Sequence, residues 1–164
     1  MRRFVTWSIH IERGFAQFFR VRQTPEEIAD ETAHALTAPT YLTPGAYFSL
    51  GVWELPEGKD LRLVPEDDPS RNSFMHVGGS YQAMTVELRV PDPHHGYTQY
   101  TVARQPVTDP HAWVPISWGD GDDLVTVHVH PEEVFTGHQA APLFRAYILH
   151  DTTPPPHLLR QLDI

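Results

Sequence analysis

Two histidines separated by one residue, His128 and His130, have the spacing in this sequence that best suits metal chemistry. Both lie in the segment VTVHVHPEEVFTGH at 125–138, and two glutamates follow them. Residues two apart in a strand point to the same side, about 7 Å apart along the backbone. Imidazole and carboxylate groups are common ligands of zinc and iron. One hypothesis is therefore a small metal-dependent enzyme that uses His128, His130 and Glu133.

The position of the acids argues against this hypothesis. Cupins, which are metalloproteins of the double-stranded β-helix type, carry a similar His-x-His pair. Their glutamate lies further along the chain than Glu132 and Glu133 do here, and their second motif has no counterpart downstream. The alternation in 125–130 instead predicts that three valines face the core while His128 and His130 face solvent. We therefore predict no metal site in this segment.

Other catalytic arrangements are also missing from the sequence. The chain contains no cysteine, which excludes thiolate nucleophiles, disulfides and thiolate zinc sites. No Gly-x-Ser-x-Gly elbow occurs, and neither phosphate-binding glycine pattern can be written over any segment. We predict a protein with no catalytic residues and no cofactor, and a small hydrolase or isomerase with an undetected site is the alternative.

The elements that position these residues are mainly strands. Proline is frequent and cuts the middle of the chain into short apolar runs. Alternation from Val5 predicts an N-terminal hairpin that turns at Arg13-Gly14 and returns through Phe15 to Val21. Further strands are expected at 46–54, 60–64, 73–78, 82–90, 98–105, 113–118 and 124–130, with a last one at 158–162.

Two helices interrupt the strands. Thr24-Pro25-Glu26-Glu27 joins a capping hydroxyl, a proline at the first helical position and a glutamate three residues after the cap, which predicts a helix over 24–37. Apolar residues at helical spacing predict a second helix over 137–150, although Pro142 would displace its start or bend it. The predicted fold class is α+β, a largely antiparallel sheet with both helices packed on it.

Length and charge limit the class of partner. The 164 residues suit a single domain, over 1–164. A formal charge of −9 disfavours nucleic acid and anionic membranes, and it favours a basic protein partner. No stretch approaches the roughly 18 apolar residues that a membrane span needs. We expect a cytoplasmic protein that binds neither nucleic acid nor membrane directly.

The last third of the chain resembles a known family. It contains a Trp-Gly-acid turn at 118–120, then the strand and turn ending in Val129-His130-Pro131-Glu132-Glu133-Val134-Phe135-Thr136, then a helix and a closing Pro156-x-x-Leu159-Arg160-x-Leu162. This pattern is similar to immunity proteins of actinobacterial polymorphic toxin systems, in the α+β family found beside deaminase toxins. The resemblance implies an inhibitor that binds a secreted toxin, one that acts on nucleic acid, and has no catalytic residues of its own.

An immunity protein would use acidic and aromatic surface residues against a basic toxin cleft. Two acidic loops are candidates, each with a solvated surface as the simpler interpretation, and each tryptophan has core packing as its alternative. A general partner-binding module is the other open function. The predicted partner-binding residues are Trp113, Trp118, Asp120, Asp122, Asp123, Glu66, Asp67 and Asp68.

Overall fold

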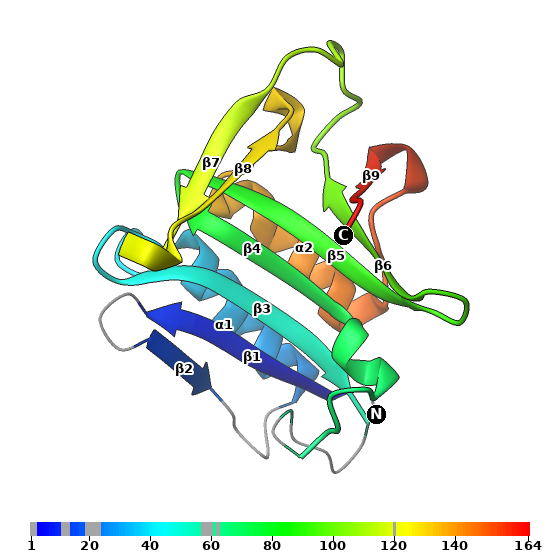
Figure 1. Ribbon diagram of the computed structural model, residues 1–164. Coiled ribbons are helices and arrows are strands. Elements are labelled where there is room, and N and C mark those ends of the chain that lie inside the picture. Colours follow the sequence, from blue (N-terminus) through cyan, green and yellow to red (C-terminus); the bar gives the residue numbers. More distant parts are fainter. Residues whose placement is uncertain (1–2, 11–13, 19–23, 57–60, 62, 120) are drawn as a thin grey trace.

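The computed structural model describes residues 3–10, 14–18, 24–56, 61, 63–119 and 121–164 (Figure 1). Within these residues, seven strands form one antiparallel sheet in the order β2-β1-β3-β4-β5-β6-β9. Both helices pack on one face of this sheet, which confirms the predicted α+β class. The strands are β1 (Arg3–His10), β2 (Gly14–Phe18), β3 (Tyr47–Leu55), β4 (Phe74–Ser80), β5 (Ala83–Asp92), β6 (Gly96–Val102) and β9 (Leu159–Gln161).

The predicted strand at 60–64 is wrong in its described residues. Leu61 and Val64 belong to a turn and pack against Val5 and Leu55 in a small apolar cluster. The two side chains are three residues apart, and a turn lets both reach the same cluster, whereas a strand would send them to opposite faces. Residues 60 and 62 lie outside the described residues, as do 11–13 at the predicted N-terminal turn.

Helix α1 (Pro25–Thr37) begins where its capping residues predict. The Thr24 hydroxyl accepts a hydrogen bond from the Glu27 amide at 3.2 Å, and the Glu27 carboxylate accepts one from the Thr24 amide at 2.9 Å. These bonds satisfy amides that the first helical turn leaves without partners. The helix ends before Pro39, as predicted.

Helix α2 (Gly137–His150) begins at its capping box, and Pro142 lies inside it without moving the start. Thr136 and Gln139 form the box, with bonds of 3.3 and 2.9 Å. Gly137 also donates its amide to the Tyr81 carbonyl at 2.7 Å. A Cβ at Gly137 would lie 1.7 Å from the Leu36 carbonyl oxygen, so only glycine allows the two helices to approach this closely.

The main core lies between the helices and the sheet. Alternate residues of β3, β4 and β5 meet the buried faces of α1 and α2 there. Burying one large apolar side chain stabilises the fold by about 1.5–3 kcal/mol relative to leaving it exposed. The largest fully buried apolar side chains include Leu36, Leu42, Met75, Met84, Leu88, Phe144 and Ile148.

A separate hairpin lies beside the main sheet without pairing with it (Figure 1). Strands β7 (Val114–Trp118) and β8 (Val125–Val129) pair in an unbroken antiparallel register, joined through the 3₁₀ turn η2 (Gly121–Asp123). The Trp118 indole lies on Gly78 of β4, where a Cβ would come within 2.7 Å of the ring. Three more 3₁₀ turns complete the described structure: η1 (Pro69–Asn72), η3 (Pro131–Glu133) and η4 (Pro156–Leu158).

None of the helices in the described ranges has the length and apolar character needed to cross a membrane.

Candidate functional site

The sheet face opposite the helices carries polar and aromatic side chains, and we call it the polar face. In Figure 1 neither α1 nor α2 covers this face. The register places its residues in cross-strand rows, because the alternate residues of each strand share a face. Its members are Trp53, Phe74, His76, Glu87, Arg89, Tyr97, Gln99, Thr101 and Arg160.

Gln99 connects the charges at the centre of the polar face. Its side-chain amide donates to Glu87 Oε2 at 2.5 Å, and its Oε1 accepts from Arg89 Nε at 2.7 Å. The Arg89 guanidinium lies over the rings of Phe74 and Tyr97, 4.8 and 3.9 Å from their centroids. Bonds to charged groups and cation–π contacts fix the orientation of all three polar side chains.

Burial shifts the acid–base behaviour of this face. Burial raises the pKa of Glu87, although the hydrogen bond from Gln99 and the charges of Arg89 and Arg160 oppose the increase. Burial, followed by the charge of Arg89, lowers the pKa of His76 to about 4. His76 is therefore a neutral imidazole at neutral pH, and its ring makes a T-shaped pair with the Trp118 ring, 6.5 Å between centroids.

The fully buried side-chain oxygens and nitrogens of the polar face have hydrogen-bond partners. In the described part of the chain, the buried side-chain oxygens and nitrogens without a partner are Thr32 Oγ1 and Glu132 Oε2, and neither belongs to this face. The hydrogen bonds among Glu87, Arg89 and Gln99 hold the Arg89 guanidinium over the rings of Phe74 and Tyr97.

A second cluster adjoins the polar face at β9. Arg160 donates from Nε to Glu133 Oε1 at 2.7 Å and from Nη2 to Glu133 Oε2 at 2.9 Å. Glu133 is fully buried, and its Oε2 also accepts the His130 amide at 2.8 Å. His130 Nδ1 lies 2.8 Å from the Ala112 carbonyl, so that nitrogen carries the proton in the bond. The centroids of the Trp113 and His130 rings lie 3.8 Å apart.

Two of the three residues of the metal hypothesis, His130 and Glu133, already bond to other protein groups. His128 is exposed on β8, whereas His130 is buried and Glu133 is bound to Arg160. The expectation that His130 faces solvent is wrong, because β8 ends at Val129 and His130 starts the turn η3. Among the residues that the structure describes, no group of three histidine, aspartate or glutamate side chains is placed to hold a metal ion.

The valines of β8 also differ from the expectation. Val129 is buried, but Val125 is 42% exposed, so it does not face the core as the alternation predicts. Val125 pairs with Trp118 at the last position of the ladder, where the ring of Trp118 packs on Gly78 of β4. Leu124, directly before it, is 56% exposed. The end of the hairpin therefore offers two adjacent apolar side chains to solvent.

The first group of predicted partner-binding residues lies on this hairpin and at its base. Trp113 is 47% exposed, Asp122 is exposed, and Trp118 is half-buried against Gly78. Asp123 closes the 3₁₀ turn η2, but its side chain lies outside the described residues, and so does all of Asp120.

The second group lies in the loop before β4. Glu66 and Asp67 are exposed. Asp68 is half-buried and caps η1, where its Oδ1 accepts from the Ser70 amide at 2.9 Å and from the Ser70 hydroxyl at 2.7 Å. The same loop exposes Leu63.

The structure places the two acidic groups at opposite ends of β4. The loop with Glu66 precedes Phe74, while Trp118 at the hairpin end covers Gly78, roughly 13 Å further along a strand. The sequence patterns did not identify the polar network between them. One signal was present, since Glu87 and Arg89 alternate with apolar residues in 82–90 and must share a face.

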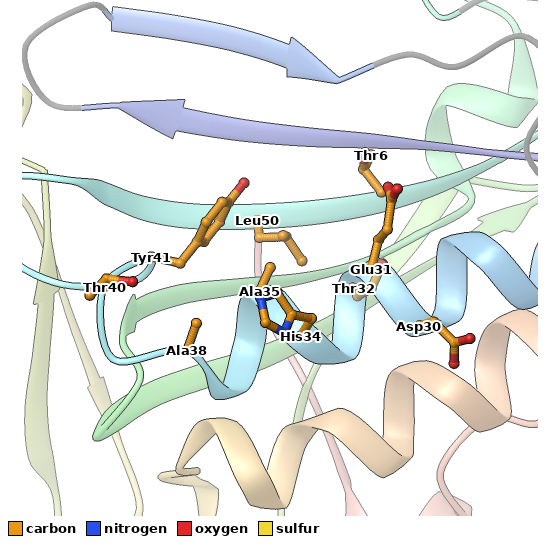
Figure 2. A pocket seen from close by; sticks show the side chains of 10 residues that line it. All are labelled: Thr6, Asp30, Glu31, Thr32, His34, Ala35, Ala38, Thr40, Tyr41 and Leu50. Atoms are coloured by element: carbon orange, nitrogen blue, oxygen red, sulfur yellow. The ribbon is translucent and has the colours of Figure 1, made fainter.

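A cavity of about 480 Å³ lies on the other side of the sheet, between α1 and strands β1 and β3 (Figure 2). Its wall includes Ala35, Leu50 and the Thr32 side chain, whose hydroxyl is buried. Asp30 at its rim is paired with Arg145 of α2. Because the Thr32 oxygen is not accessible from the cavity, it gives a ligand no hydrogen bond there.

No family model, curated protein or solved structure matches this chain.

Proposed function

We propose that this protein binds a basic partner protein through the two ends of its polar face, which we call the rims. We further propose that it acts as an immunity protein that neutralises a nucleic-acid-targeting toxin. One observation supports the binding role best. At both ends of the face an exposed apolar side chain accompanies exposed acids: Leu63 with Glu66 and Asp67, and Leu124 with Asp122. Apolar contacts surrounded by charge are typical of protein interfaces.

Trp113 is the best candidate for an anchor. Almost half of it is exposed, yet its tilted contact with the His130 ring and the nearby Arg160 guanidinium hold its ring in place. A tryptophan that is already ordered loses little conformational freedom on binding, and tryptophan is enriched among the residues that dominate interface energies. Its partner would receive a flat apolar surface at the base of the hairpin, roughly 13 Å along β7 from the end that carries Asp122 and Leu124.

The charge distribution supports a basic partner. The chain carries a formal charge of −9. On the polar face, Gln99 bonds to both Glu87 and Arg89 and Arg160 is paired with Glu133, so the exposed acids dominate at the two ends. A toxin that binds nucleic acid presents a cationic cleft, and carboxylates can take the places of phosphates there. Such charges accelerate association more than they strengthen the final complex.

Coexpression with toxin domains encoded by neighbouring genes tests this function. The wild type is expected to restore growth and to bind the toxin domain in a purified system. Trp113→Ala is expected to weaken binding by about 2 kcal/mol or more, roughly thirtyfold. Glu66→Lys is expected to slow association. Glu26→Lys, at an exposed position of α1, makes the same charge change on the helical side and is the control.

The outcomes separate the alternatives. Equal effects of Glu66→Lys and Glu26→Lys would point to overall charge and not to the rim. Affinity without restored growth would leave a general binding module. Substrate turnover by the purified chain, or a stoichiometric metal bound through His128 and His130, would replace the proposal with an enzyme.

A further inference from the structure

The two edges of the β7–β8 hairpin differ in their ability to accept another strand. A proline fits within a strand ladder where its nitrogen faces away from the neighbouring strand. Pro115 of β7 pairs with His128 of β8, so at this pair the backbone groups of both residues point outward. The outer edge of β7 therefore lacks an amide at its centre.

The outer edge of β8 keeps its backbone groups. The ladder alternates, so Thr126, two residues before His128, also directs its amide and carbonyl away from β7. Within the described ranges the hairpin sheet has two strands, and no third strand pairs with β8. Proline, charged residues and register shifts usually protect the edge of a sheet from pairing. The strand VTVHV has none of these features.

Apolar side chains accompany this open edge. Val125 and Leu124 are both substantially exposed at the start of β8, and exposed Asp122 precedes them. A strand added at the edge would extend the hairpin sheet and bring its own side chains beside these residues. A second copy of this chain is a poor occupant, because two chains of formal charge −9 repel each other.

We propose that β8 binds an extended, basic segment of the partner protein as an added β-strand. This inference rests on the proposed partner binding and specifies its mode. Backbone bonds to Thr126 and His128 supply the pairing, while alternate side chains of the added strand contact Val125 and Val127. Lysine or arginine in that segment lies near Asp122, which favours a basic strand over a neutral one.

A model peptide tests the edge in the absence of the partner protein. The probe is a synthetic peptide of about ten residues in which valine and lysine alternate, added to the ¹⁵N-labelled full chain. We expect saturable shifts and slowed hydrogen exchange at the Thr126 and His128 amides. A peptide N-methylated at alternate residues cannot form the ladder, and it is expected to bind at least about tenfold more weakly.

Two variants at one position provide the matched comparison. His128→Pro removes the outward amide, and Pro115 shows that this pair position accepts proline. His128→Val removes the imidazole but keeps the amide. Binding is expected to fall at least about tenfold for the proline variant and to remain within about twofold for the valine variant. The N-methylated peptide keeps the test decisive if the proline variant fails to fold.

Three results would overturn this inference. They are the absence of saturable binding, binding that leaves the two amides unshifted, and protection of those amides that depends on protein concentration without peptide, which would make a second copy the occupant. A toxin domain bound equally by wild type and His128→Pro would refute strand addition and leave the proposed function intact. Peptide binding at β8 by a protein that binds no toxin domain would support strand addition and refute the proposed function.

Discussion

Arg160 and Glu133 form a two-bond ion pair that joins β9 to a turn 27 residues earlier in the chain. The glutamate is fully buried, and its second oxygen also holds the amide of His130, whose ring supports Trp113. Strand β9 thus fixes the orientation of the exposed Trp113 through Glu133 and His130. The orientation of Trp113 depends on a contact between segments that no local pattern connects.

Removing the Glu133 charge should destabilise the fold. Glu133→Gln leaves the Arg160 guanidinium without its counter-charge and weakens the bond to the His130 amide. We expect a loss of about 2–4 kcal/mol in the free energy of unfolding, because breaking a buried pair costs more than losing an exposed one. Urea denaturation measures this loss. Glu66→Gln at an exposed position should change stability by less than about 0.5 kcal/mol, and equal effects would refute the structural role of the pair.

Gly137→Ala should separate the two helices. The new Cβ would lie 1.7 Å from the Leu36 carbonyl oxygen, a backbone atom that cannot turn aside. We expect destabilisation of more than about 2 kcal/mol, seen as a lower denaturation midpoint. Gly96→Ala is the comparison, since its site has open space and only an unfavourable φ of 83°. A Gly137→Ala variant as stable as Gly96→Ala would contradict the close approach of α1 and α2.

Gly78→Ala should displace the hairpin rather than unfold the sheet. Its Cβ would lie 2.7 Å from the Trp118 ring, and that ring belongs to a hairpin that rests on the face of β4. We expect changed amide signals throughout β7 and β8 and a shifted Trp118 indole signal in NMR spectra. Signals of α1 and α2 should stay unchanged, because they lie on the other side of the sheet. Changes confined to β4 would show that the contact does not hold the hairpin.

Sequence patterns predicted the contacts within one element but not those between elements. Thr24 and Glu27 are three residues apart, and their capping box predicted the start of α1 because all its atoms belong to one turn. Strand alternation likewise located β4 and β5 to within a few residues. Gln99 of β6 bonds to Glu87 of the neighbouring strand β5, and no pattern within either strand specifies that contact. The exposed Val125 was missed because alternation gives a face but does not say what covers it.

Acidification should reduce stability through His76. Its pKa in the folded protein is about 4, below its ordinary value of 6.5, so the unfolded chain binds the proton more readily. The stability from neutral His76 is therefore complete above about pH 6.5 and is lost as the pH falls toward 4. The raised pKa of Glu87 acts in the opposite direction, since its stabilising effect is present at low pH and lost as the carboxyl ionises.

His76→Gln should flatten the pH dependence of unfolding. We expect the wild type to lose about 1–3 kcal/mol more than the variant between neutral pH and pH 4. Thermal denaturation across this range measures the difference, and the exposed His128→Gln change provides a matched control. Parallel curves for wild type and His76→Gln would show that His76 protonates as easily in the folded protein as in the unfolded one.

Association with a basic partner should slow on acidification and at raised salt. The sequence contains 11 histidines, and their protonation brings a chain of formal charge −9 close to neutrality, although His76 stays neutral until well below pH 6. Stopped-flow or surface-binding kinetics should therefore give a smaller association rate constant near pH 5.5 than near pH 7.5. The dissociation rate constant should change much less, because it reports the apolar contacts of Trp113 and Leu124 more than the rim charges. Association rates that respond to neither pH nor salt would mean that the acidic rims do not steer the partner.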